Sequence, residues 1–199
     1  MDTCSGALDG GAVMNVDTLT LSNCTISNCT AARYGGAVFD NLGAAGRGGD
    51  GKNGIITVDS CVFKNNTAKS GAAIHYKNAV SQMLTLKGAC IFSGNKDIEG
   101  NADDICLGPD YKAKTQLSEE GSTTTPFAVE SFSLESGSDA QVTLTATNTK
   151  AGMVLCSGGA SYLDLFTYKN QDFEIVTQGS DLALKLITTT YMLTGENGS

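Results

Sequence analysis

The chain contains no tryptophan, only two prolines and a single histidine among its 199 residues. It also has no run of about 20 apolar residues, so we expect no transmembrane helix. The formal net charge of −8 argues against nucleic acid and anionic lipid as partners. No C-x-x-C pair and no Cys/His cluster occurs, so no zinc site and no cofactor is predicted.

A block of about 25 residues occurs three times in the first half of the chain. The copies start at Thr18, Ile55 and Met83, and they are called here the first, second and third block. Within a block, apolar residues alternate with Thr, Ser or Asn, as in Leu19 and Leu21, which is the pattern of a β-strand. Repeats of this length imply a solenoid, in which each unit buries its apolar face by stacking on the next.

Each block is predicted to form three short strands joined by tight corners, which describes one coil of a parallel β-helix. A leucine-rich repeat has a similar period but needs a helical segment, and the blocks contain none. Equivalent side chains should then stack about 4.8 Å apart. The expected inward ladders are Leu19/Ile56/Leu84, Leu21/Val58/Leu86, Cys24/Cys61/Cys90, Ile26/Phe63/Phe92 and Val13/Val38/Ile74/Ile105.

Two short motifs alternate along the blocks. GGA-V occurs at residues 10–13 and 35–38, and F-x-x-N occurs at residues 63–66 and 92–95. This alternation over residues 4–107 resembles the repeats of the chlamydial polymorphic outer membrane proteins and of related β-helix, adhesin-like surface proteins. The resemblance implies a right-handed parallel β-helix, exposed at a cell surface and used for adhesion. The first F-x-x-N copy departs from the motif, because it reads Ile26-Ser27-Asn28-Cys29.

The predicted organisation is all-β in three parts: β-helix repeats over residues 1–110, a polar linker over 111–126, and continued coils or a β-rich cap over 127–199. A small separate β-sandwich is the alternative for the last part. Six runs there have strand character, and they are Phe127–Leu134, Gln141–Ala146, Gly152–Leu155, Tyr162–Phe166, Asp172–Val176 and Leu182–Thr189.

The seven cysteines fit the repeat better than they fit a disulfide framework. Cys24, Cys61 and Cys90 share one inward position, where a free thiol acts as a small apolar side chain. Cys4 and Cys29 share another position one coil apart, at a spacing that either reduced thiols or a disulfide can adopt.

The glycine-rich stretch over residues 41–54 interrupts the regular pattern and is predicted to project from one corner. Loops on a rigid scaffold often carry binding function. Arg47, Asp50, Lys52 and Asn53 are therefore the candidate ligand-binding residues, and a tolerated insertion without function is the alternative.

An acidic group, formed by Asp97, Glu99, Asp103 and Asp104, is the only candidate for calcium binding or for paired catalytic carboxylates. Asp103 and Asp104 replace Gly36 and Ala37 of the first block, and we expect them to face solvent. His75 is likewise expected to point outward from its strand.

These features predict a non-catalytic fragment of an adhesin-like protein, secreted or at the cell surface, that presents a binding surface to a host cell or a glycan. The first residues lack the basic and apolar segments of a signal peptide, so no export signal is expected within this sequence. Two alternatives are a β-helix polysaccharide lyase or glycoside hydrolase, and a purely structural stalk segment.

Overall fold

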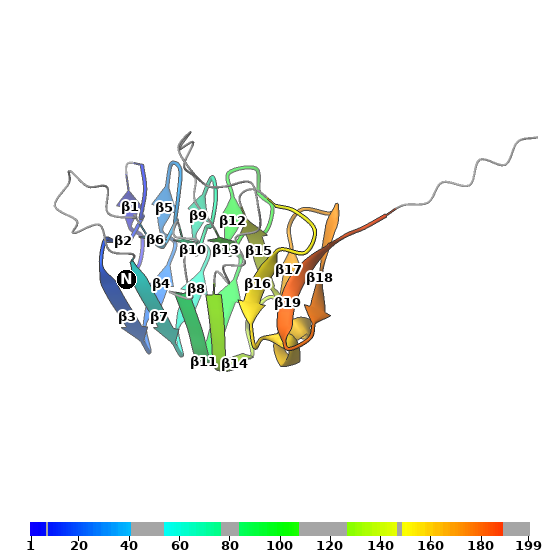
Figure 1. Cartoon of the computed structure of the whole chain (residues 1–199). Helices are drawn as coiled ribbons and strands as arrows, with labels where there is room; N and C mark the ends of the chain where they lie inside the picture. Colours follow the sequence, from blue (N-terminus) through cyan, green and yellow to red (C-terminus); the bar gives the residue numbers. More distant parts are fainter. Residues whose placement is uncertain (7, 41–53, 77–83, 108–126, 147–148, 189–199) are drawn as a thin grey trace, which may run out of the picture.

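The computed structural model describes residues 1–6, 8–40, 54–76, 84–107, 127–146 and 149–188. These residues form an all-β structure in which parallel pairing dominates and antiparallel pairing enters near the end of the chain. From one end of the molecule to the other, the strands follow broadly in the order of the chain (Figure 1). The one helix in the described ranges, η1 (Ala160–Leu165), is too short to cross a membrane.

The strands of the first half are short, except for the ten-residue β11. They are β1 (Ser5–Gly6), β2 (Val13–Asn15), β3 (Thr18–Ser22), β4 (Thr25–Ser27), β5 (Thr30–Ala31), β6 (Val38–Asp40), β7 (Ile55–Asp59), β8 (Val62–Lys64), β9 (Thr67–Ala68), β10 (Ile74–Tyr76), β11 (Leu84–Ser93), β12 (Lys96–Asp97) and β13 (Ile105–Leu107). Those of the second half are β14 (Phe127–Leu134), β15 (Val142–Ala146), β16 (Val154–Ser157), β17 (Phe166–Tyr168), β18 (Phe173–Gln178) and β19 (Asp181–Leu186).

Three sheets collect these strands: a four-stranded sheet in the order β1-β5-β9-β12, a six-stranded sheet in the order β17-β15-β13-β10-β6-β2, and a nine-stranded sheet in the order β18-β19-β16-β14-β11-β7-β3, to which β4 and β8 are added through the pairing of β4 with β8 and of β8 with β11. Along each block the chain therefore visits all three sheets in turn, and each sheet places equivalent strands of the three blocks next to one another. Ile56 pairs with both Leu19 and Leu84, and Phe63 pairs with Ile26 and Phe92. The predicted register of these ladders is confirmed.

The first and second blocks contain four short strands and not the predicted three, whereas in the third block the long strand β11 pairs with both β7 and β8, so three strands suffice. The additional strand is β5 in the first block and β9 in the second, and β12 is its equivalent in the third. Corners separate the strands, and residues there adopt positive φ, with values of 52° at Asn23 and 54° at Asn28. Asparagine and glycine tolerate this left-handed conformation, so each corner can turn the chain within one or two residues.

The F-x-x-N motif has a structural explanation. The rings of Phe63 and Phe92 stack in the interior with centroids 5.2 Å apart. The motif asparagines, Asn66 and Asn95, are buried, and Asn66 Nδ2 donates to Asn95 Oδ1 at 3.0 Å. In the first block Cys29 takes the asparagine position, and its backbone N–H donates to Asn66 Oδ1. The buried amides thus satisfy backbone groups of the neighbouring block.

The GGA-V motif allows close approach between blocks. A Cβ on Gly36 would overlap the carbonyl oxygen of Ala72, so no larger residue fits there while the strands keep their spacing. Gly35 adopts a φ of 64°, which glycine accepts without strain. The motif therefore combines one conformational requirement with one steric requirement.

The second half agrees with five of the six predicted strands. The remaining prediction, a strand over Tyr162–Phe166, is wrong, because Ala160–Leu165 forms the helix η1 and the strand β17 begins only at Phe166. β14, β15 and β17 pair in parallel with earlier strands, whereas β19 runs antiparallel to both β16 and β18. The proposed linker over 111–126 lies outside the described residues.

Candidate functional site

The acidic group of the third block is divided between the interior and the surface, and its expected exposure is wrong for two members. Asp103 and Asp104 are each 1% exposed, whereas Glu99 is exposed. The register of β10 and β13 places them opposite Ala72 and Ala73, which are themselves completely buried. We expected these carboxylates to face solvent. Their alignment with the buried Ala72 and Ala73 places both of them in the interior instead.

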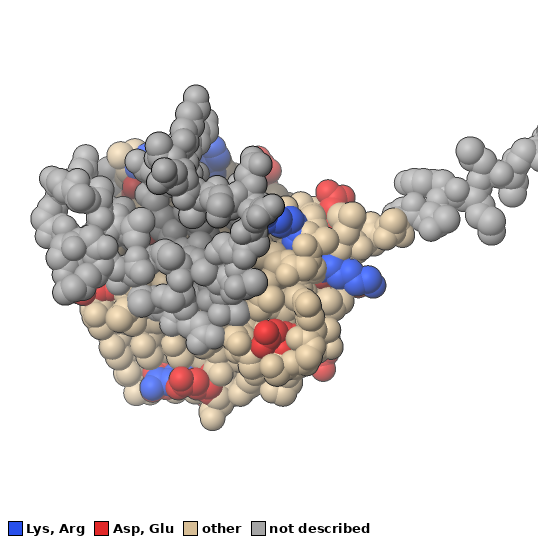
Figure 2. Space-filling model, in the orientation of Figure 1, with Lys and Arg blue, Asp and Glu red and all other residues tan. Residues whose placement is uncertain are grey.

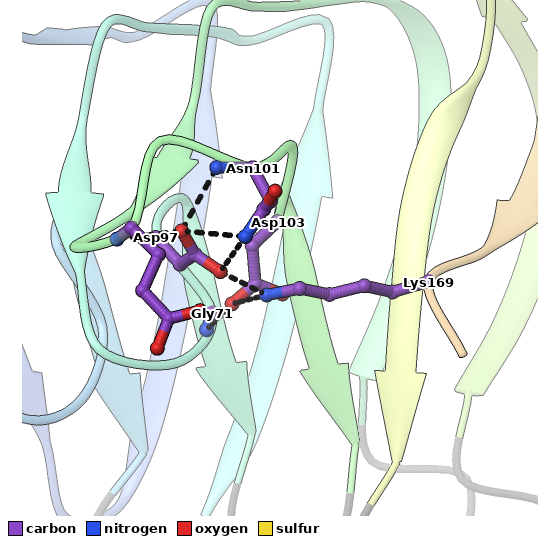
Figure 3. A network of polar contacts seen from close by, with 6 residues as sticks. Gly71, Asp97, Asn101, Asp103 and Lys169 are labelled. Atoms are coloured by element: carbon purple, nitrogen blue, oxygen red, sulfur yellow. Dashed lines mark hydrogen bonds and ion pairs between the residues drawn. The ribbon is translucent and has the colours of Figure 1, made fainter. Parts of the chain in front are cut away.

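Lys169, which directly follows β17, neutralises two of these acids (Figure 3). Its Nζ lies 2.8 Å from Asp97 Oδ2 and 3.2 Å from Asp103 Oδ2. Asp97 Oδ1 also accepts hydrogen bonds from the backbone N–H groups of Glu99 and Asn101. We call Asp97, Asp103 and Lys169 the aspartate–lysine cluster.

Burial and hydrogen bonding act in opposite directions on this cluster. Burial would raise the pKa of Asp97, but hydrogen bonds from Lys169 and Asn101 hold that pKa well below its usual range. For Asp103, burial prevails and raises the pKa despite the nearby lysine. Burial would also lower the pKa of Lys169, and the two carboxylates raise it instead. The cluster is an internal ion pair, and within the described residues no group of three acids, histidines or cysteines is arranged to hold a metal ion.

Asp104 belongs to a separate buried network. Its Oδ1 accepts a hydrogen bond from Asn95 Nδ2 at 2.9 Å, and its Oδ2 accepts one from the backbone N–H of Thr143 at 2.8 Å. Burial raises the pKa of Asp104 to about 6. The network continues the asparagine ladder of the blocks into the second half of the chain.

His75 is also buried, at 1% exposed, so the expected outward exposure is wrong. It does lie on the face of β10 opposite the inward Ile74, but Tyr34 and Phe39 pack beside it, with ring centroids 4.6 Å and 5.6 Å from the imidazole. Cys106 is its register partner on β13. The face of this sheet that alternation marks as outer is therefore an aromatic layer and not a solvated surface.

The predicted loop residues Arg47, Asp50, Lys52 and Asn53 lie outside the described residues. Two surface features in the described part remain as candidates for binding. The first is on the nine-stranded sheet, where Thr20, Thr57 and Thr85 are register partners on β3, β7 and β11. Together with Thr18 they are called the threonine face.

The threonine face is flat and uncharged. Its side chains alternate with the buried ladders, and neighbouring threonines repeat at the strand spacing of about 4.8 Å. A charged row borders it, in which Lys87 Nζ lies 3.7 Å from Asp59 Oδ2. In Figure 2 the described residues visible below the grey atoms are mostly uncharged, and a group of charged side chains lies at the lower border.

The second feature is a hollow of about 270 Å³ at the C-terminal end of the described structure. It lies between β17 and β18, and we call it the edge slot. Its lining consists of Gln141, Leu163, Asp164, Phe166, Thr167, Tyr168, Phe173, Glu174 and Ile175. In the aspartate–lysine cluster, Lys169 fixes the position of the chain immediately after β17. The cluster therefore positions β17, which forms one wall of the slot.

Sequence reasoning missed Lys169 and the edge slot. A signal for the cluster was present, since Asp97 replaces the buried Ala68 of the second block, and a buried acid needs a cation. No pattern in the sequence pointed to Lys169, because it meets the acids only through the pairing of β15 with β17. Comparison of the chain with protein-family models, with curated proteins and with solved structures finds no match.

Proposed function

We propose that the chain is a non-catalytic part of an adhesin-like, right-handed parallel β-helix protein, and that it presents the threonine face to a ligand outside the cell. The observation that carries the proposal is the row of in-register threonines on a sheet whose other side packs against the core. Threonine offers a hydroxyl and a methyl group at each step, which suits weak polar contacts repeated along an extended ligand.

The coil architecture is part of the same proposal. Three observations support it: each block contributes strands to all three sheets, equivalent residues of the blocks pair in register, and corners recur at equivalent positions. The resemblance to polymorphic outer membrane proteins adds the right-handed sense and the location at a cell surface.

The acids support a non-catalytic role. Hydrolysis of a glycoside needs two carboxylates that face a substrate. Asp97 and Asp103 instead bind the partly buried Lys169, and Asp104 binds Asn95 and Thr143 in the interior. We therefore expect no release of unsaturated or reducing ends from pectin, polygalacturonate or alginate, with or without calcium. Release that disappears on Asp103→Ala would establish the enzyme alternative.

The binding test uses a glycan array and cultured host cells with the purified chain. The double variant T57E/T85E introduces negative charge into the threonine face and should abolish binding. Thr25→Glu is the matched control, because Thr25 is also an exposed strand threonine but lies on β4, beyond the corner at Asn23 and outside the threonine row. Equal binding by both variants would contradict the proposed face, and absence of any ligand for the native chain would favour the stalk alternative.

A further inference from the structure

The edge slot lies where two sheets end. β17 is the last strand of the six-stranded sheet and β18 is the last strand of the nine-stranded sheet, so within the described residues each pairs on one side only. Both strands lie at the end of the molecule opposite β3 (Figure 1). A strand edge carries backbone N–H and C=O groups that can pair with another chain.

The lining of the slot shows that these edges face it. Three consecutive residues of β17, Phe166 to Tyr168, contribute to the lining, as do three consecutive residues of β18, Phe173 to Ile175. Successive side chains of a strand point to opposite faces of its sheet. Contact with three in succession brings the hollow against both side-chain and main-chain atoms of each strand, and we infer that it follows the strand edges.

The side chains at the slot define what fits into it. Leu163, Phe173 and Ile175 are half-buried and offer apolar contacts, whereas Asp164 and Glu174 are exposed carboxylates at its rim. Glu174 already attracts a cation, since its Oε1 lies 2.9 Å from Lys185 Nζ in an exposed pair. The net charge of −8 adds a long-range attraction for a basic partner.

We propose that the edge slot binds an extended, basic peptide segment of a partner protein by strand addition. The backbone of the peptide would pair with the free edge of β17 or β18, an apolar side chain would enter between Phe173 and Ile175, and a Lys or Arg would meet Asp164 and Glu174. Strand addition combines backbone hydrogen bonds for affinity with alternating side-chain positions for specificity. This inference concerns a different surface from the threonine face and does not depend on it.

The test is selection from a phage-displayed library of random dodecapeptides on the immobilised full chain, followed by affinity measurement with the synthetic peptides that are enriched. We expect enriched sequences to alternate β-branched or aromatic residues with Lys or Arg. The double variant D164K/E174K should weaken their binding at least tenfold. Asp59→Lys, at a partly exposed acid bordering the threonine face, is the control and should leave the affinity for these peptides unchanged.

A second readout separates strand addition from simple charge attraction. Replacing the central residue of an enriched peptide with proline removes a backbone donor and should abolish binding, whereas alanine there should preserve most of it. Circular dichroism confirms that each protein variant is folded. The proposal is overturned if no enriched peptide depends on Asp164 and Glu174, if proline is tolerated, or if a neutral oligosaccharide on the glycan array binds in a way that Phe173→Ala abolishes.

Discussion

Three aspartates distinguish the third block from the first two. Where the second block buries Ala68, Ala72 and Ala73, the third has Asp97, Asp103 and Asp104 in the same register. A buried alanine can pack directly against the same position of another block, whereas a buried aspartate needs a counter-charge or hydrogen-bond donors. The second half of the chain supplies these as Lys169 and the backbone N–H of Thr143. The three aspartates thus mark the end of the repeated blocks, where the third block contacts the second half of the chain.

Removal of the lysine should be costly. Lys169→Met leaves Asp97 and the buried Asp103 without their shared cation, and we expect a loss of about 3 kcal/mol in the free energy of unfolding. Lys185→Met is the matched control, because Lys185 pairs with Glu174 on the surface and should contribute less than about 1 kcal/mol. Urea denaturation of both variants measures the difference, and equal losses would contradict an essential role for the cluster.

Asp104 should make stability depend on pH in a defined direction. Its pKa in the folded protein is raised to about 6, above its value in the unfolded chain, so the folded state binds the proton more tightly. Stability should therefore fall as the pH rises from about 4 to about 6, by roughly 3 kcal/mol for this group, and then level off.

The comparison that isolates this effect is between the native chain and Asp104→Asn, which cannot ionise. Urea midpoints at pH 5 and pH 7 should show a larger gain on acidification for the native chain than for the variant. Parallel pH profiles of the two proteins would exclude Asp104 as the titrating group.

At the scale of elements, alternation decides which side chains are buried. On β7, Ile56 and Val58 are fully buried, and Thr57 between them lies on the threonine face. On β4, Thr25 is exposed and the next residue, Ile26, is 1% exposed. Because the period is two residues, a shift of one position would place every apolar side chain on the wrong face.

This register predicts opposite outcomes for two acidic substitutions. Val58→Asp places an unpaired charge in the interior, which costs several kcal/mol and should unfold the chain. Thr25→Asp places the same side chain on the surface and should cost less than about 1 kcal/mol. Thermal unfolding followed by circular dichroism measures both, and similar tolerance at the two positions would refute the register.

At the scale of the whole molecule, the two ends of the sheets differ from the middle. β3 is an outermost strand, and Cys24 at its corner is half-buried, whereas Cys61 and Cys90 at the equivalent positions of the second and third blocks are buried. The prediction that all three thiols are buried is therefore correct for two of them. All seven cysteines are free, including Cys4 and Cys29, for which a disulfide had been left open.

Thiol labelling should report this gradient. Cys4 and Cys24 are partly accessible and should react first with a thiol reagent, whereas the five buried thiols should react only after denaturation. Burial also raises the pKa of several buried cysteines, for Cys156 to about 12, which disfavours the reactive thiolate. Mass spectrometry after brief labelling gives the order, and fast labelling of Cys61 or Cys90 would contradict the fold.

The sequence alone determined the strand blocks, their mutual register and most of the strands of the second half. These depend on alternation and on corner residues, which are local properties repeated along the chain. The sequence did not determine the burial of His75, Asp103 and Asp104, the helix at Ala160–Leu165, the ion pair with Lys169 or the edge slot. Each of these arises from contacts between segments far apart in the chain. Only the tertiary structure decides whether a charged side chain faces water or a partner.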